Sequence, residues 1–567
     1  MRNTRFTRAA FCFIIKGNKT GSTGPFERTL EGMMLRHPDL IALYVEGGEI
    51  SAHGSRAVLN DASAWTEMGE GELLLKVTAA SSAPRYVRLR WNFAGDEAPQ
   101  DDVKIFGDVW ERSYADMEWR GIVPQRCMPW VCAASNGSDG KSDVSGRRTD
   151  CYGVKTRASA LCFWQYDPRG VTLWADVRNG GSGVRLNGRE LTACRIVFES
   201  YRDMSAFDAL YAFYKGLNDV VLTPDHKVYG SNNWYYAYGN SSHEDILGDS
   251  KLLSALCAGL ENRPYMVIDD GWQPNRCDAP WNRGNERFPD MKRLCGEMKA
   301  LGVRPGIWIR YLNDTARGTE GVLPEHRLMR DDKYLDPSHP DVLARVARDT
   351  KRIVEDWGYQ LIKHDFSTFD MFGRWGVNCP TNLTDDGWHF WDRTKTSAEI
   401  VVNFYRTIHE AAGENTVIIG CNVIGHLTAG LAHLNRTGDD TSGREWDRTR
   451  KYGVNALAFH MLQDKTFFAA DADCVGIMGT FPWALNRRWL RALSVSGTPL
   501  FVSCKPGVLN ADELKELSEA YARASVQTDV FKPLDWMENS CPERWLLNGE
   551  ETRFDWYDEI GADNFRP

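Results

Sequence analysis

The chain has 567 residues, and 68 lysines and arginines against 77 aspartates and glutamates give it a net charge of −9. This balance argues against a nucleic-acid partner, because binding to phosphates needs a basic surface. Hydrophobic residues make up 43% of the sequence without any run of about 18 apolar residues, so we expect a soluble multidomain protein with no membrane span.

Residues 1–220 are expected to form an all-β sandwich. The segment 86–91 alternates polar and apolar residues, as a half-buried strand does. Similar segments at 170–177 and 191–199 are separated by glycine-rich turns, a pattern typical of two packed antiparallel sheets. A helix at 205–216 would connect this domain to the next one.

Strand-like and helix-like segments alternate over residues 225–505. Eight such repeats predict a (β/α)8 TIM barrel. The helix at 340–357 is expected to begin after Ser338 as its N-cap. The eight expected strands are 228–236, 265–270, 303–311, 360–365, 417–422, 432–438, 467–473 and 499–504.

The last part of the chain, 506–567, is expected to be a small C-terminal segment. It contains one amphipathic stretch, 511–523, which predicts a helix. Two short apolar segments, 544–547 and 553–556, predict a β-hairpin after it. The fold class is therefore a β-sandwich, a barrel and a short β remnant in that order.

Cysteine usage and the N-terminal residues favour a cytoplasmic protein. The 14 cysteines are scattered, with neither a CxxC pair nor a Cys/His ladder of zinc spacing. Arg2, Arg5 and Arg8 precede an apolar run, 9–15, that is short for a secretion signal and ends at Lys16. We expect neither a metal nor another cofactor, and His364, His426 and His433 should be neutral buried histidines.

Acidic residues follow three of the expected barrel strands. Asp269 and Asp270 end the second strand, Asp365 ends the fourth, and Asp439 and Asp440 follow the sixth. A single aspartate at a strand end often caps a helix, but carboxylates converging from three strands must be compensated or used. Glycoside hydrolysis uses two, one beneath the anomeric carbon and one beside the leaving oxygen.

Further side chains suited to sugar binding lie at the same strand ends. The chain has 21 tryptophans, and indole rings pack against the apolar faces of sugars, although a large core can account for many of them. The additional candidates for substrate binding are Trp234, Trp308, Arg310, Lys363, Cys421, Asn422 and Arg436.

The ordered motifs Asp269-Asp270-Gly271-Trp272, Lys363-x-Asp365 and Arg436-x-Gly438-Asp439 resemble those of the α-galactosidases in glycoside hydrolase families 27 and 36. The segment 288–308, which leads into the third strand, is similar as well. The large β region before the barrel is similar to family 36 in particular. The resemblance covers the barrel, and the N-terminal region by architecture alone.

The resemblance implies a retaining mechanism with a covalent glycosyl-enzyme. Asp365 would be the nucleophile and Asp439 the general acid/base, because a small residue, Gly438, precedes it as in the clan. Asp440 is the competing candidate for the acid/base. Arg436 would orient the acid or the sugar.

The resemblance also implies how galactose would be bound. Asp269 and Asp270 would accept hydrogen bonds from its axial O4 and its O6, and Lys363 would contact the sugar. Two departures concern this site: His364 stands where the clan has an aromatic residue, and the strand after Cys421 lacks the clan's glycine cluster, which senses the C2 substituent. Oligosaccharides or glycosides are the expected substrates.

Several alternatives stay open at this point. The first expectation is an exo-acting α-galactosidase, and the same residues would serve an α-N-acetylgalactosaminidase or a galactosyl transferase of the raffinose-synthase type. A catalytically dead carbohydrate-binding barrel would not need both a nucleophile and an acid. The loop after the fourth strand, 367–395, carries Trp375, Trp388 and Trp391, which could cover the pocket or pack in the core. A homo-oligomer is also possible.

Overall fold

The computed structural model of the chain describes residues 34–99, 102–137, 139, 143–379, 381–526, 531–557 and 561. All of them belong to one unit of the chain, Glu31–Pro567. The residues on which the expected absence of a secretion signal depends, 2–16, lie outside the described part.

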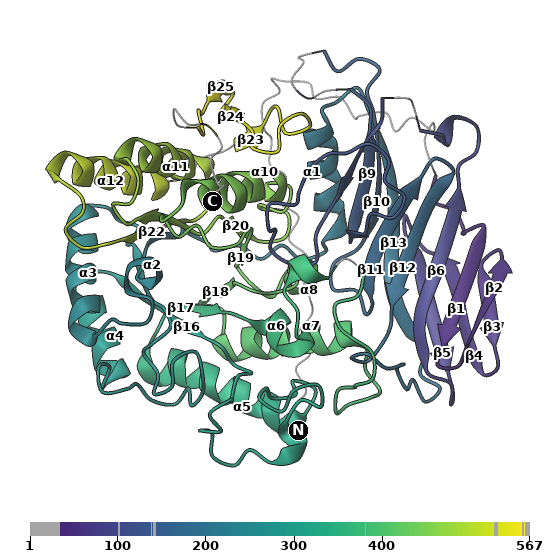
Figure 1. The fold of residues 1–567 in the computed structure, drawn as a ribbon, viewed down its shortest axis with the longest axis horizontal. Coiled ribbons are helices and arrows are strands. Elements are labelled where there is room, and N and C mark those ends of the chain that lie inside the picture. Colours follow the sequence, from purple (N-terminus) through teal and green to yellow (C-terminus); the bar gives the residue numbers. More distant parts are fainter. Residues whose placement is uncertain are drawn as a thin grey trace, which may run out of the picture. The chain divides into compact units, whose positions relative to one another are not determined.

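Two antiparallel sheets form the N-terminal region (Figure 1). The first contains, in spatial order, β2 (Gly48–His53), β1 (Leu40–Val45), β6 (Pro84–Asn92), β12 (Gly170–Asp176), β11 (Leu161–Asp167) and β8 (Met128–Pro129). The second contains β3 (Arg56–Leu59), β4 (Ala62–Met68), β5 (Leu73–Ala79), β13 (Leu191–Arg202), β10 (Arg148–Val154), β9 (Val131–Ser135) and β7 (Lys104–Gly107).

Aromatic side chains fill the space between these two sheets. Val87, Leu89 and Trp91 of β6 are fully buried, so the alternation expected for this strand is confirmed. The ring of Trp91 meets that of Phe198, which belongs to β13 of the opposite sheet, at a centroid distance of 5.1 Å. Such edge-to-face contacts across a dry interface hold the sheets together by burial and by ring electrostatics.

The second half of the chain forms a curled, nine-stranded parallel sheet, which fits a TIM-like domain (Figure 1). Each of the eight expected strand segments contains one of its strands. In spatial order the sheet contains β20 (Ala469–Asp471), β19 (Leu434–Arg436), β18 (Val417–Gly420), β17 (Leu361–His364), β16 (Arg304–Ile309), β15 (Tyr265–Ile268), β14 (Tyr229–Asn232), β22 (Leu500–Cys504) and β21 (Cys474–Ile477).

The two strands at the ends of this order, β20 and β21, are consecutive in the chain. Only Ala472 and Asp473 separate them, and Asp473 has a φ of 66°, which a strand cannot accommodate. The chain therefore pairs with β19 before this break and with β22 after it.

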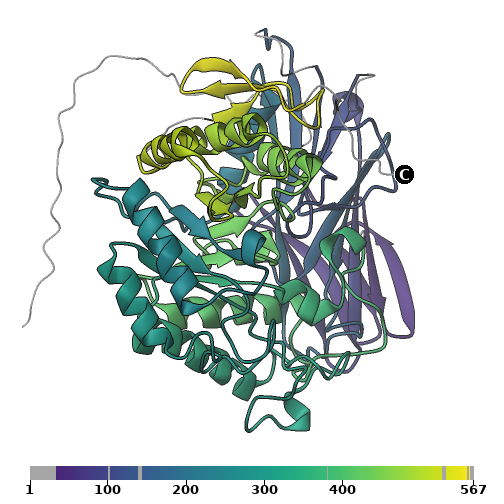
Figure 2. The same cartoon turned by 60° about the vertical axis from the view of Figure 1, so that its left-hand side comes forward.

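Helices cover the outside of the curled sheet, as Figures 1 and 2 show. They are α3 (His243–Leu256), α4 (Met291–Ala300), α5 (Pro340–Lys351) with the π-helical η3 (Arg352–Trp357), α7 (Ser397–Ala412), α9 (Trp446–Arg448) with the π-helical η5 (Thr449–Asn455) and α10 (Ala456–His460), α11 (Trp483–Ser496) and α12 (Ala511–Ala524), which packs on α3, α11 and β14. The short helices α2 (Trp234–Ala237), α6 (Ser367–Phe372) and α8 (Gly425–Thr428) follow the carboxyl ends of β14, β17 and β18. The remaining helical segments are α1 (Ala206–Leu217) and the 3-10 turns η1 (Gly95–Glu97), η2 (Pro324–His326) and η4 (Gly376–Asn378).

The N-cap expected for α5 is wrong by one residue. The side chain of His339 accepts the N–H of Asp341, whereas the Ser338 hydroxyl donates to Asp336. Pro340 occupies the first helical turn, where its fixed φ and missing N–H fit. The residue directly before the proline therefore takes the cap.

A three-stranded sheet follows α12 and contains β23 (Phe531–Pro533), β24 (Arg544–Leu547) and β25 (Glu550–Arg553). The second strand of the expected hairpin, 553–556, is therefore misplaced. Asn548 and Gly549 both have positive φ and close a two-residue turn directly after β24. Asn-Gly is the sequence that such a turn favours, and it fixes the register.

Two properties of the described chain bear on its location. None of its helices combines the length and the apolar character needed to cross a lipid bilayer. The thirteen cysteines within the described ranges are all free thiols. The cytoplasmic location expected from the sequence stays a prediction.

We predict that Phe198→Ala destabilises the N-terminal sheets by about 3–5 kcal/mol, because it leaves a cavity among Trp91, Tyr152 and Trp164. Urea unfolding followed by tryptophan fluorescence measures the shift in midpoint. Met68→Ala, at a side chain 49% exposed on β4, is the control and should leave the midpoint nearly unchanged. Equal midpoints for both variants would contradict the packing described.

Candidate active site

A cavity of about 420 Å³ opens at the carboxyl ends of the curled sheet. Nine of the twelve residues expected at the site line it, namely Trp234, Asp269, Asp270, Trp308, Lys363, Asp365, Cys421, Asp439 and Asp440. Six further residues complete the wall: Arg112, Tyr114, Cys277, Phe366, Trp375 and Val377. The strand-end rule therefore brings together carboxylates from β15, β17 and β19, as expected.

The two carboxylates after β15 both reach the pocket because the strand ends at Ile268. Gly271 follows with a φ of 105°, and a Cβ there would lie 2.5 Å from the carbonyl oxygen of Gly239, so only glycine fits. Asp269 accepts from Lys363 Nζ at 2.7 Å and from Asn232 Nδ2 at 2.8 Å.

Asp270 is held by a second, separate set of donors. Its Oδ1 accepts from Gln273 Nε2 at 2.6 Å and from the backbone N–H of Cys277 at 2.7 Å. Burial raises the pKa of Asp270, and these two hydrogen bonds act against it. Its Oδ2 lies 3.5 Å from Arg276 Nε. Neither aspartate serves as a helix N-cap.

Strand β17 carries Lys363 and Asp365 on the same side, two residues apart. Asp365 Oδ2 accepts from Trp308 Nε1 at 3.2 Å, and its Oδ1 accepts from the N–H of Phe366 at 2.8 Å. Burial acts to lower the pKa of Lys363, but the Asp269 carboxylate and weaker contributions from Cys421 and Asp365 together raise that pKa above its usual value. Lys363 is therefore a fixed cation in the floor of the pocket.

His364 lies between these two residues and points to the other side of the strand. Its ring is buried between Tyr311 and Tyr405, at centroid distances of 6.5 and 5.8 Å. Burial lowers its pKa to about 4, so it is neutral. An imidazole thus takes the packing position of an aromatic ring and does not enter the pocket.

Asp439 and Asp440 have different surroundings although they are adjacent. Asp439 is flanked on both oxygens, by Arg112 on Oδ1 and by Arg448 on Oδ2, each at 3.3 Å. Asp440 pairs through Oδ1 with Arg436 at 3.1 Å. Among the described residues no hydrogen-bond donor contacts its Oδ2. Burial would raise the pKa of Asp440, but the charges of Arg436 and Arg112 lower it.

Three of the expected residues do not reach the pocket wall. Arg310 lies behind the wall, where it contacts the sulfur of Cys277 and binds Asp370 through Nε at 3.0 Å, which compensates a carboxylate that is itself fully buried. Asn422 donates to Glu111, and Arg436 lies beneath the pocket against Asp440 and Asp473. All three residues lie at or near strand ends, as expected. The direction of each side chain is determined by an acidic side chain close to it.

A segment that follows β7 supplies wall residues that the sequence did not reveal. Ser113 forms a parallel β-bridge with Gly438, and this places Arg112 and Tyr114 in the pocket. Residues 108–114 show no strand or helix periodicity. Their contact with β19 is long-range, so no local signal could have predicted it.

The tryptophans of the loop after β17 have three different positions. Trp375 lines the pocket and stacks on Phe369 at 4.6 Å. Trp388 is buried against Gly180 of the N-terminal region, and Trp391 is 51% exposed next to His339. One of the three therefore faces the pocket, together with Trp234 and Trp308.

A second cavity, about 470 Å³ in volume, lies at the opposite, amino ends of β14, β20 and β22. It is lined by loop residues such as His226, Lys227 and Lys465 and contains none of the expected site residues. In parallel α/β sheets of this kind the chemistry occurs at the carboxyl ends. The cavity of about 420 Å³ at the carboxyl ends is therefore the candidate active site.

One group of side chains within the described ranges has the composition of a metal site: His326, His339 and Asp341. The N–H of Leu323 donates to Nδ1 of His326 at 3.1 Å, and that of Asp341 donates to Nδ1 of His339 at 3.2 Å. Each neutral ring therefore carries its proton on Nε2 and has no lone pair left for a metal. None of the three residues lines the pocket, and their donors do not fit a metal ion.

Neither a protein-family model nor a curated protein sequence matches the chain. Solved structures match its fold, and those with this fold include α-galactosidases of glycoside hydrolase family 36. The resemblance expected from the motifs is confirmed at the level of the fold, because identities of 13–16% establish no more than that.

Three of these structures show the extent of the match. An α-galactosidase from Thermus thermophilus, TtGalA, solved with p-nitrophenyl α-D-galactopyranoside, matches with a TM-score of 0.56 and 16% identity over 88% of this chain and 99% of that one. AgaA from Geobacillus stearothermophilus gives 0.57 and 13%, over 90% and 79%. AgaB from the same organism gives 0.55 and 13%, over 87% and 69%.

Proposed function

We propose that this protein is a retaining, exo-acting α-galactosidase that hydrolyses terminal α-galactosides through a covalent glycosyl-enzyme. The observation that carries the proposal is the convergence of carboxylates from β15, β17 and β19 on one pocket, beside the buried cation Lys363. The shared fold with family 36 α-galactosidases, one of them solved with an aryl α-galactoside, supports this choice of sugar.

Asp365 is proposed as the nucleophile. Trp308 and the Phe366 N–H each donate to one of its oxygens, which orients the carboxylate toward the pocket. An Asp365 oxygen would attack the anomeric carbon while the acid/base protonates the departing glycosidic oxygen. Water, deprotonated by the same acid/base, would then break the new glycosyl ester and release galactose with retention.

The acid/base belongs to the Asp439–Asp440 pair. The sequence motif favours Asp439, which follows the small residue Gly438. The contacts favour Asp440, which lines the pocket and whose Oδ2 has no donor among the described residues, while Arg112 and Arg448 occupy both oxygens of Asp439. Both candidates lie on the same rim, so the mechanism is the same for either.

Asp269 and Asp270 are proposed to select galactose. Asp269 already accepts three hydrogen bonds from the protein and Asp270 accepts two, which fixes each carboxylate in place and leaves lone pairs for sugar hydroxyls. Charge-assisted bonds of this kind contribute about 1.5–3 kcal/mol each. An epimer without the axial hydroxyl would leave a buried carboxylate unpaired, which costs more than a missing contact.

Other functions use the same site. A galactosyl transferase of the raffinose-synthase type differs only in its acceptor, and an α-N-acetylgalactosaminidase differs at C2, near Cys421. Arg112 lies 3.8 Å from the Cys421 sulfur, so a guanidinium lines this part of the pocket. A carbohydrate-binding barrel without activity would have no use for the nucleophile arrangement around Asp365.

The proposed layout has three parts. Residues 1–220 form a β-sandwich domain, 225–505 form the catalytic (β/α)8 barrel, and 506–567 form a small C-terminal segment. The barrel is proposed to be closed because β20 and β21 occupy one strand position, so nine strand segments correspond to eight strands.

We expect p-nitrophenyl α-D-galactoside to be cleaved with a kcat/KM at least about 100-fold above that for the α-D-glucoside, because the aspartate pair reads the axial O4. Asp269→Ala should abolish most of this preference. Asp332→Asn, which alters an exposed ion pair with Arg317, is the control and should leave it intact.

A preference for the α-glucoside would refute the proposed sugar. A preference for the N-acetyl-α-galactosaminide would refute only the assignment at C2. An acceptor-dependent release of product, with little hydrolysis in water alone, would favour the transferase.

Replacing the nucleophile by an isosteric amide, Asp365→Asn, should lower kcat by at least about 1000-fold, since about 4 kcal/mol of barrier lowering is then lost. The thermal midpoint should stay within a few degrees of the parent. In Asp365→Gly, azide should take the place of the carboxylate and release β-galactosyl azide. Activity of Asp365→Asn within tenfold of the parent would contradict the assignment.

Azide also distinguishes the two acid/base candidates. Dinitrophenyl α-galactoside has a leaving group that needs little protonation, so the acid/base→Ala variant should form the glycosyl-enzyme normally and then stall. Added azide should release α-galactosyl azide from that variant alone. We expect this behaviour from either Asp439→Ala or Asp440→Ala, and rescue of neither would place the acid elsewhere.

A further inference from the structure

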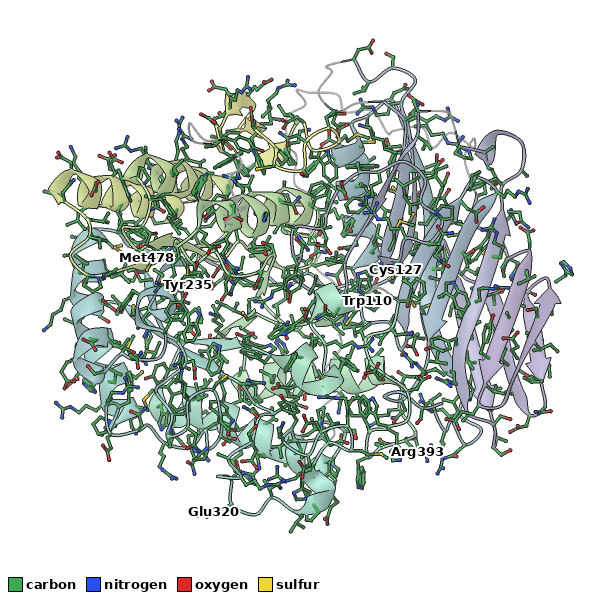
Figure 3. The ribbon with its side chains drawn as sticks, viewed as in Figure 1. Trp110, Cys127, Tyr235, Glu320, Arg393 and Met478 are labelled. Carbon is green, nitrogen blue, oxygen red and sulfur yellow. The ribbon has the colours of Figure 1, made fainter. Side chains whose placement is uncertain are left out.

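The segment that follows β7 leaves its sheet and pairs through Ser113 with the backbone directly after strand β19. The N–H of Ser113 donates to the Thr437 carbonyl at 2.7 Å, and the N–H of Asp439 donates to the Ser113 carbonyl at 3.2 Å. In Figure 3, Trp110 lies where the N-terminal sheets meet the curled sheet, on the path of this segment. Residues 112–114 therefore lie directly beside the backbone that presents the two candidate acids.

Buried carboxylates anchor the segment at two further points. Asp108 accepts from Tyr214 Oη at 2.7 Å and from Gln463 Nε2 at 3.1 Å. Glu111, also buried, accepts from Tyr114 Oη at 2.8 Å and from the N–H of Gly376. Because Glu111 is held on one side of Arg112 and Ser113 on the other, the backbone of Arg112 has little freedom to move.

The guanidinium of Arg112 reaches both carboxylates of the acidic pair. Its Nη2 lies 3.3 Å from Asp439 Oδ1 and its Nη1 lies 3.9 Å from Asp440 Oδ1. In the described part of the chain, Arg436 and Arg448 each pair with only one of these side chains. The Arg112 side chain is 8% exposed, so its charge acts with little screening by water.

We propose that Arg112 is a positioning residue, supplied by the N-terminal region, that holds the Asp439–Asp440 pair in place for proton transfer to the glycosidic oxygen and then from the attacking water. This inference rests on the proposed function. A planar guanidinium with several fixed donors suits the task, because it can bind two carboxylates at once.

The charge of Arg112 also has a consequence for the pH dependence. The groups that face the acidic pair are Arg112 from the β7 segment, Arg448 from α9, Arg436 from β19, Lys363 from β17 and Tyr235 from α2. Removing one of these cations raises the pKa of the acid/base, which then stays protonated to higher pH. The alkaline limb of the kcat/KM profile reports this group.

The test uses Arg112→Gln, Arg112→Lys and a matched control in the same region, Arg90→Gln, which breaks an ion pair with Asp167 within the first sheet. Arg112→Gln should lose about 30-fold or more in kcat/KM, which reports formation of the glycosyl-enzyme, on a p-nitrophenyl or natural galactoside, but less than about threefold in kcat/KM on the dinitrophenyl galactoside. Its alkaline limb should move up by about one pH unit. Arg112→Lys keeps the positive charge, so the alkaline limb of its kcat/KM profile should lie at the same pH as that of the parent protein.

Each outcome decides between two explanations. Equal losses on both substrates, or an unmoved alkaline limb in an Arg112→Gln protein with a parental melting temperature, would overturn the positioning role. If Arg112→Gln does not fold, Arg112→Lys decides. An alkaline limb at the parent's pH, together with a loss of activity on the p-nitrophenyl galactoside but not on the dinitrophenyl galactoside, supports the proposal. An equal loss of activity on both substrates overturns it. A parent without activity on any α-galactoside would instead refute the proposed function.

Discussion

The pocket depends on one constraint, which the ion pair between Lys363 and Asp269 shows: each buried carboxylate needs a cation beside it. The charged atoms of this pair are 2.7 Å apart and both side chains are nearly buried, so neither charge is solvated by water. Removing one partner of such a pair leaves an uncompensated charge, at a cost of about 3–5 kcal/mol. The same requirement applies at β19, where Arg436 and Arg112 compensate Asp440 and Asp439. The acids can converge only because cations converge with them.

Sequence patterns predicted the curled sheet and most of the pocket wall because one geometrical rule links them. In a parallel sheet all carboxyl ends face one side, so a residue such as Asp365 at a strand end is placed once the strand is recognised. The same rule does not decide where a long side chain points. Arg310 and Asn422 have the predicted positions, yet the buried acids Asp370 and Glu111 attract them away from the pocket.

Features that depend on a single backbone conformation or on distant contacts could not be predicted. The break of a strand at Asp473 needs a positive φ that an aspartate rarely adopts, and the periodicity on either side continues through it. The second strand of the hairpin is misplaced because the apolar residues at 553–556 indicate a strand, whereas the Asn548-Gly549 turn starts β25 at Glu550. Arg112 gave no local signal because the fold alone brings it to Cys421, 309 residues later in the sequence.

The bridge between Ser113 and Gly438 has a consequence for the synthesis of the protein. At about 5–20 residues per second, a ribosome needs roughly 15–60 s to advance from Arg112 to the strand that Arg112 contacts. During this interval the N-terminal sheets can already be folded, while the Arg112 guanidinium is still hydrated and has no carboxylate beside it. Catalytic competence therefore arises late, at the step in which the finished barrel takes up a loop that was made long before.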